Sequence, residues 1–317
     1  MAAIKYAVTG EQNESFYAKK FELERQWRQR ALDPEAILLA LQTLIESKKL
    51  VLAQQEQSEN LEFRDWINKI LDRERQYHLA FFGREFDLTE FERKLRFCGR
   101  RKIKAWQSLG HEPHFLPDVS LMPGDEYPGW RIKPEQRFYQ MLVKGKIFRN
   151  IDGQLNKVLR AGLDGISVLI DIRPKPAYDD GRQMYGKDNL LGKIIEQLRK
   201  ERKIVQYDSG LQSSRFGVSA DEWEEKIKPA LAGKMALDIN RLRLETVEES
   251  NIIPQLYPDS RKNDGSTNTS VWYEQYFVGC GHRFSGGSSG NGVLADVFCS
   301  SSDDHWGGRS FRPLAVL

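Results

Sequence analysis

The C-terminal segment from Val271 to Leu317 interleaves two kinds of residue. One kind is a framework, mostly of aromatic, glycine and aliphatic residues and closing on an Arg-Pro pair: Trp272, Tyr273, Phe284, Gly286, Gly287, Leu294, Ala295, Phe311, Arg312 and Pro313. The other is a set of small polar residues mixed with a few large ones: His282, Asn291, Asp296, Phe298, Ser300, Ser301, Ser302, Asp303, Asp304, His305 and Trp306. A solvated loop would lack the first set, and a plain strand would lack the second. The mixture therefore predicts a rigid scaffold that presents a recognition surface.

The length of the chain bounds the number of domains. At 317 residues it is longer than a typical single core, so two domains are expected. Its composition, 40% hydrophobic and 29% charged, is typical of a globular protein. The net charge of +3 neither requires nor excludes a nucleic-acid partner.

The cysteine content and the N-terminus bear on the compartment. Three cysteines, Cys98, Cys280 and Cys299, are too few for a disulfide framework. Whether Cys280 pairs with Cys299 stays open, because pairing needs an oxidising compartment and a suitable geometry. The N-terminal stretch MAAIKYAVTGEQNESF has no apolar core typical of a secretory signal, and no segment reads as a membrane span. The default expectation is a cytoplasmic protein, with export or surface display by another route left open.

Residues 1–110 are predicted to form an α-helical domain. Asp33-Pro34 is typical of a helix start, and apolar residues follow at helical spacing over residues 37–45 and again over 63–82. The T-E-F-E sequence at 89–92 has the spacing of a capping box. We interpret the apolar stripes as the packing face of a small helical bundle rather than as a cofactor site.

Residues 111–161 are predicted to be a linker and a helical connection. The first part, residues 111–130, is rich in proline and glycine, which indicates irregular structure. Its two histidines are too close in sequence to share a helical face, and Pro113 between them breaks a helix, so no metal site is expected there. Residues 136–163 have a helical pattern.

Residues 162–317 are predicted to be an α+β domain. The aliphatic run at 166–172 is typical of a buried strand. Residues 188–203 have the pattern of an amphipathic helix, and Ser219 with Glu222 has the spacing of a capping box. After Glu245 we expect short strands separated by glycine-containing turns, so two helices precede a glycine-rich β region.

Catalytic signatures are weak in this chain. It contains no G-x-x-x-x-G-K-[ST] loop for phosphates and no G-x-S-x-G nucleophile elbow. Asp303, Asp304 and His305 are adjacent, and adjacent side chains of an extended chain point to opposite faces. Cys280 and His282 can share a strand face as nucleophile and base, but no third group orients them. We expect a protein that is not an enzyme and needs no cofactor or metal; an enzyme centred on Cys280 and His282 is the alternative.

A basic stretch gives a second alternative. Residues 96–104, RFCGRRKIK, form either a solvated helix face or a contact for phosphates. No aromatic stacking pattern accompanies the cations. A nucleic-acid-binding adaptor is therefore an alternative function and not the one we favour.

The composition of the tail favours recognition. Binding loops are rich in Tyr, Trp, Ser, Gly and Asn, because aromatic residues supply rigid contact area while small polar residues adapt. Tyr276, Phe298 and Trp306 lie among many Ser, Gly and Asp residues. The competing interpretation is that these aromatic residues are the core of a small β domain.

The tail also resembles the C-terminus of variable proteins that are diversified by diversity-generating retroelements. The matching residues are Trp272-Tyr273, Arg283-Phe284 with Gly286-Gly287, residues 292–295, and the closing R-S-F-R-P at 309–313 with its aliphatic end. Residues 214–231 and 243–258 resemble the segment that precedes such tails, so the resemblance covers roughly residues 162–317. It implies a C-type-lectin-like fold of the formylglycine-generating-enzyme subtype, in which the framework residues hold the core.

The resemblance implies that adenine-directed mutagenesis rewrites selected codons near the 3′ end of the gene. Asn codons of the template then become codons for Ser, Asp, Gly, Tyr, His, Cys and related residues. The implied ligand-binding face comprises Tyr276, Cys280, His282, Asn291, Asp296, Phe298, Ser300, Ser302, Asp303, Asp304, His305 and Trp306. The ligand is expected to be a protein or another macromolecule.

Within that face, we expect two aromatic residues to supply most of the affinity, Phe298 and Trp306, because few residues usually dominate an interface. We expect Asp303, Asp304 and His305 to tune specificity. The enzymes of this fold use a closely spaced cysteine pair for copper, whereas Cys280 and Cys299 are far apart, which argues against oxidase chemistry. No calcium ligand set stands out, and the oligomeric state stays open.

Overall fold

The computed structural model describes residues 19–20, 22–23, 25–26, 33–151, 153–177, 185, 188–261, 267–277, 282–287, 294 and 296–317, without the side chains of 34 and 47–60. The chain divides into two compact units, Met1–Trp66 and Ile67–Leu317. The helical domain predicted from the sequence ends at residue 110, well beyond this division. The helices between Ile67 and Ser108 therefore belong to the same unit as the strands.

Helix α2 (Pro34–Phe82) begins as the sequence predicts. The Asp33 carboxylate accepts a hydrogen bond from the Glu35 N–H at 3.0 Å, and Pro34 occupies the first helical position. In the first unit most of the apolar side chains between residues 37 and 45 are exposed: Leu38 by 62%, Leu41 by 47% and Ile45 by 52%. The prediction that these residues are the buried face of a bundle is therefore wrong for the described part of the first unit.

The end of α2 and helix α3 (Thr89–Ser108) bury apolar faces in the second unit. Phe81 and Phe82 of α2 join the main core, and Trp106 of α3 is buried and donates its Nε1–H to the Met235 carbonyl at 3.0 Å. The predicted capping box at the start of α3 does not form. Instead, the Asp87 carboxylate accepts hydrogen bonds from the N–H of Thr89 at 2.9 Å and from its hydroxyl at 2.6 Å.

One sheet has four strands in the order β1-β4-β10-β5, all antiparallel: β1 (His111–Ser120), β4 (Gly162–Asp171), β10 (Pro313–Val316) and β5 (Leu242–Leu244). Strand β4 confirms the buried strand predicted at 166–172. Residues 111–120, expected to be irregular, form β1 instead. Pro113 and Pro117 are tolerated because β1 is an edge strand, where a missing N–H donor leaves no neighbour unpaired.

The second sheet follows the order β3-β2-β6-β7-β8: β3 (Gln154–Lys157), β2 (Ile147–Ile151), β6 (Ser270–Phe277), β7 (His282–Gly286) and β8 (Val297–Ser301). Strand β9 (Arg309–Phe311) pairs in parallel with β6. The helix predicted over residues 136–163 is limited to α4 (Gln136–Val143). Gly153, at φ +82°, then lies in the turn of the β2–β3 hairpin, a backbone conformation that favours glycine.

The remaining helices are α5 (Leu191–Lys200), α6 (Ala220–Glu222), η2 (Trp223–Ile227), α7 (Lys228–Met235), η3 (Ile239–Arg241) and α8 (Val247–Leu256). Helix α5 and the Ser219–Glu222 capping box confirm their predictions. Helix α8 contradicts the prediction, because short strands were expected after Glu245. Its start carries a reciprocal capping box between Thr246 and Glu249.

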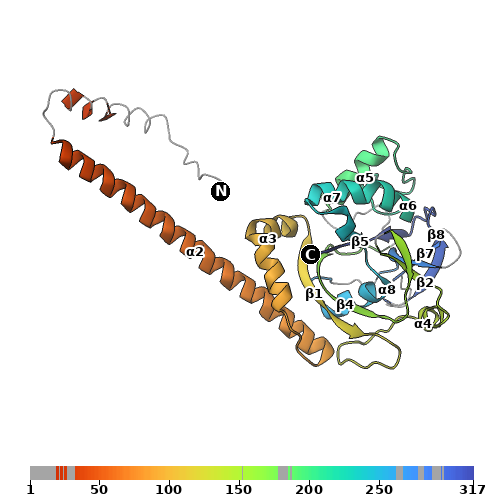
Figure 1. Cartoon of the computed structure of the whole chain (residues 1–317). Helices are drawn as coiled ribbons and strands as arrows, with labels where there is room; N and C mark the ends of the chain where they lie inside the picture. Colours follow the sequence, from red (N-terminus) through yellow and green to blue (C-terminus); the bar gives the residue numbers. More distant parts are fainter. Residues whose placement is uncertain are drawn as a thin grey trace. The chain divides into compact units, whose positions relative to one another are not determined.

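The core of the second unit lies around α8, which contacts β4 of one sheet and β6 of the other (Figure 1). Ile252 and Ile253 of α8 pack in one buried cluster with Val168 of β4 and Val271 of β6. Helices α5, α6 and α7 gather at one end of this unit (Figure 1). The mixed α+β class is confirmed. None of the helices in the described part of the chain has the length and apolar character that a membrane span requires.

Candidate recognition surface

At the start of strand β8 the pleat places one side chain in the core and the next on the surface. Strand β8 is the last strand of its sheet, and it pairs with β7 so that Ser285 lies opposite Phe298 and Gly286 opposite Val297. Successive side chains of a strand point to opposite faces. Val297 is buried in the core, whereas the next side chain, Phe298, is 47% exposed.

The framework residues that the structure describes are buried; Ala295 lies outside the described residues. Trp272 is 1% exposed and donates its Nε1–H to the Val218 carbonyl at 2.9 Å, and Phe284 and Phe311 are fully buried. The glycine pair allows a close backbone approach. A Cβ atom on Gly286 would lie 1.9 Å from the Asp296 carbonyl oxygen, and the same oxygen accepts the Gly287 N–H at 3.1 Å. A side chain at position 286 would push β7 away from the start of β8.

The loop between β8 and β9 is held by main-chain hydrogen bonds. The Ser302 carbonyl accepts the N–H of Asp221 at 3.1 Å, and the Gly308 carbonyl accepts the N–H of Ser270 at 3.1 Å. Within the loop, the Asp304 N–H donates to the Ser301 carbonyl at 3.2 Å. These three bonds use only main-chain atoms, so they do not require particular side chains at the loop positions.

Arg309 is the buried support of this surface. Its guanidinium donates to Asp304 Oδ2 at 2.8 Å and to Ser300 Oγ at 2.9 Å. The same group lies 4.1 Å from the ring centroid of Trp272 and 5.4 Å from that of Trp306. Burial lowers the pKa of Arg309, although its bond to Asp304 opposes that effect. One framework cation thus joins β6, β8 and the loop.

The structure places the described site residues on strands β6, β7 and β8 and in the segments directly before and after β8. The exposed ones are His282, Phe298, Asp303 and Trp306; the half-buried ones are Tyr276, Asp296, Ser300, Asp304 and His305. The half-buried residues have defined neighbours: the Arg283 guanidinium lies 4.5 Å from the Tyr276 ring, and His305 Nε2 lies 3.2 Å from Glu222 Oε2. Burial raises the pKa of Asp296 to about 6.

One predicted position, Ser302, differs from the expected display. Ser302 is only 9% exposed, and its hydroxyl donates to Asp221 Oδ2 at 2.9 Å, so it supports the loop and is not part of the exposed surface. Cys280 and Asn291 lie outside the described residues, as does the proposed Cys280–His282 pair. Cys299 is a free, half-buried thiol whose pKa is raised by burial.

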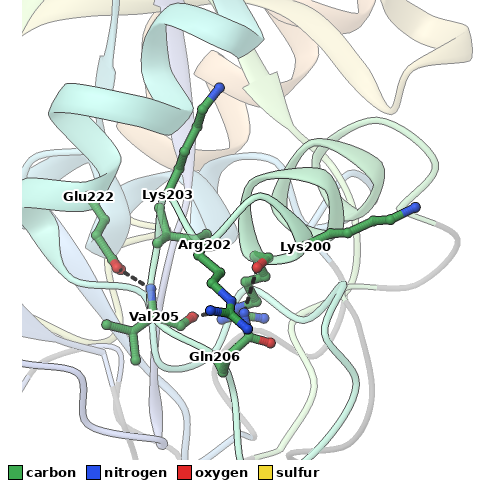
Figure 2. A pocket seen from close by; sticks show the side chains of 8 residues that line it. Lys200, Arg202, Lys203, Val205, Gln206 and Glu222 are labelled. Atoms are coloured by element: carbon green, nitrogen blue, oxygen red, sulfur yellow. Dashed lines mark hydrogen bonds between the residues drawn. The ribbon is translucent and has the colours of Figure 1, made fainter.

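A pocket of about 710 Å³ adjoins the loop and was not predicted from the sequence. It is lined by Arg199, Lys200, Arg202, Lys203, Ile204, Val205, Gln206 and Glu222 (Figure 2). Glu222 belongs to both features. Its carboxylate accepts the N–H of Val205 at 2.6 Å and that of Ser219 at 3.1 Å, and it lies beside His305 of the loop.

A buried ion-pair network supports the framework from within. Arg215 donates to Asp171 Oδ2 at 2.5 Å and to Asp188 Oδ2 at 2.7 Å. Arg312, of the closing F-R-P, donates to the Asp171 carbonyl at 3.0 Å. Despite the opposing effect of its burial, the neighbouring arginines hold the pKa of Asp171 well below its usual range. These charges are paired with one another, which indicates a structural role.

The basic stretch at 96–104 is partly engaged within α3. Arg96 donates to the Glu92 carboxylate at 2.6 Å, and the Lys102 ammonium lies 4.9 Å from the Trp106 ring centroid. Gly99, at φ +76°, interrupts the helical backbone between them. The stretch therefore does not present one regular row of free cations.

Comparison with protein-family models, curated proteins and solved structures finds no match to this chain. Among the residues that the structure describes, no group of three or more His, Cys, Asp or Glu side chains has an arrangement that could hold a metal ion. The candidate function therefore rests on the geometry of the surface itself.

Proposed function

We propose that this chain is a recognition protein whose second unit has a C-type-lectin-like fold, of the formylglycine-generating-enzyme subtype, over residues 162–317. Its C-terminal surface binds a protein or another macromolecule, and retroelement mutagenesis diversifies that surface. The observation that carries the proposal is the division of the tail into a buried framework and a display on a loop held by main-chain bonds.

The exposed aromatic residues support binding as the function. Phe298, on β8, and Trp306, in the loop that follows β8, are 47% and 44% exposed. Exposed aromatic groups lose water on contact with a partner, and interface energy is concentrated in a few such side chains. Asp303, which is also exposed, can select among partners by charge.

The polar residues of the loop favour binding over catalysis. Asp304 is bound to Arg309, while His305 lies beside Glu222. Their nearest charged partners thus differ, and an acid and base acting on one substrate would need to converge. This arrangement suits a surface that discriminates among ligands.

The experiment that tests this function is to sequence the gene with its genomic surroundings. The proposal expects a nearby reverse transcriptase and a template repeat that differs from the gene only at template adenines. The differing codons should include those for Phe298, Asp303 and Trp306 and should spare those for Trp272, Phe284 and Phe311. A gene without such a repeat, or a repeat whose differences fall on the framework codons, would contradict diversification.

A further inference from the structure

The pocket beside the loop is strongly cationic. Among its eight lining residues, four carry a positive charge and one, Glu222, carries a negative charge. The Glu222 carboxylate is already committed to two backbone N–H groups. Lys203 pairs with Glu201 at 2.6 Å, and Lys200 and Lys203 extend in different directions (Figure 2). The charge of the pocket wall therefore depends chiefly on its two arginines.

Arg199 gives the pocket a buried positive charge. Its guanidinium is fully buried and donates to the carbonyls of Val205, Gln212, Ser214 and Phe216, at 2.8–3.0 Å. All four partners are uncharged and orient the group, while the charge of the Glu222 carboxylate in the same pocket opposes the effect of burial on its pKa. Burial lowers the pKa of Arg199 to about 10, which leaves the side chain protonated at neutral pH.

Arg202 adopts a backbone conformation in which glycine is usual. It has φ +54° two residues after the end of α5, where its N–H donates to the Arg199 carbonyl and the Lys203 N–H donates to the Leu198 carbonyl, both at 2.9 Å. This is the hydrogen-bond pattern of a helix C-terminus, and its left-handed residue is most often glycine. An arginine here costs conformational energy, which points to a use for its side chain.

We propose that this pocket binds an anionic group, a carboxylate or a phosphate, and that Arg202 is its principal contact. A guanidinium donates two parallel hydrogen bonds to either group. The volume of about 710 Å³ is within the usual range for ligand sites. Because Glu222 joins the pocket to His305, an acidic group of a ligand bound at the display surface can reach the pocket. The pocket would then bind that acidic group whatever the display residues are. This role in ligand binding rests on the proposed function, whereas anion binding itself does not.

The test is a titration of the ¹⁵N-labelled full chain with inorganic phosphate and, separately, with succinate, at constant ionic strength. We expect saturable shifts confined to the amides of residues 199–206 and 222. Arg202→Gly should weaken binding by about tenfold or more, the usual effect of losing a charge-assisted pair. The same variant should be at least as stable as the wild type, because glycine relieves the backbone cost.

The control variant is Arg131→Gly, which removes an exposed arginine outside the pocket and should leave binding unchanged. Binding of both probes assigns the site to acidic groups in general, and binding of phosphate alone assigns it to phosphate. Shifts spread over the whole basic surface, or equal binding by Arg202→Gly and the wild type, would overturn the proposal. A gene without a template repeat would contradict the proposed function but would leave the evidence for anion binding unaffected.

Discussion

At the scale of single residues, the framework of the tail includes positions where the packing strongly restricts the side chain. Gly286 is the clearest case, since any Cβ there would overlap the Asp296 carbonyl oxygen. Arg309 is another, because its guanidinium contacts two strands and the loop. The exposed positions around them carry no comparable constraint, which is what a replaceable display requires.

Gly286→Ala should lower the free energy of unfolding by about 2–3 kcal/mol, because the added methyl group forces β7 and β8 apart. Urea denaturation of the purified variant measures this loss. Gly124→Ala is the matched control, since a Cβ there meets no atom within 4 Å. Similar losses in the two variants would show that steric overlap at Gly286 is not the cause.

Arg309→Met should cost about 1–3 kcal/mol, because it removes the charge-assisted hydrogen bonds to Asp304 and Ser300. Asp304→Asn removes only one charge of that set and should cost less. Denaturation curves of the two variants give the comparison. If Asp304→Asn were the more damaging change, the support would lie in the display residue and not in the framework.

At the scale of elements, local signals predicted some pieces and missed others. The periodicity of α5 and the capping box at Ser219 depend on neighbours in the sequence, so they were predictable. Strand β1 was not, because its prolines are tolerated only at a sheet edge, which is a tertiary property. Helix α8 has its own signal, the Thr246–Glu249 capping box, which the glycine-rich texture after Glu245 obscured.

The candidate site shows the same limit. The burial of Trp272 and Phe284 follows from residue type. The exposure of Phe298 and Trp306 does not, since the same residue types are buried elsewhere in the tail, and it was expected only from the resemblance. The burial of Ser302 depends on Asp221, which is 81 positions away in sequence. The pocket depends on the backbone turn at Arg202 and on Glu222 from another element. Neither leaves a local pattern that sequence reasoning can detect.

A buried glutamate in helix α8 should make the stability of the fold depend on pH. Glu248, near its start, is fully buried, and desolvation raises its pKa from 4.5 to about 7. Between these values the folded state binds more protons than the unfolded state, so this group's contribution to stability falls as pH rises. Glu248→Gln should therefore gain on the order of 2 kcal/mol relative to the wild type between pH 4.5 and pH 8.

Chemical denaturation of wild type and Glu248→Gln at both pH values measures this difference, and the other titrating groups cancel in the comparison. Glutamine keeps an oxygen for the Gln275 side chain, which donates to Glu248 at 2.6 Å. An equal stability difference at the two pH values would rule out a proton held by this carboxyl group.

At the scale of the whole molecule, the strands, the loop and the pocket all belong to the unit Ile67–Leu317. The described leucine and isoleucine side chains between Leu38 and Ile45 are exposed in the other unit. The second unit therefore contains all the buried contacts on which the candidate surface depends.

A fragment of residues 61–317 should fold with the near-ultraviolet circular dichroism of the full chain and the same urea midpoint. The reason is that its buried core, from Ile67 onward, is complete without the preceding residues. A fragment that lost its near-ultraviolet signal would show that the first unit stabilises the second.

If the framework specifies the fold, the display residues can vary without loss of folding. Two libraries test it directly: one randomises Phe298, Ser301, Asp303 and Trp306, and the other randomises Trp272, Phe284 and Phe311. The measurement is the fraction of members that resist protease when displayed on yeast. We expect most members of the first library and few members of the second to be resistant. Equal fractions in the two libraries would contradict it.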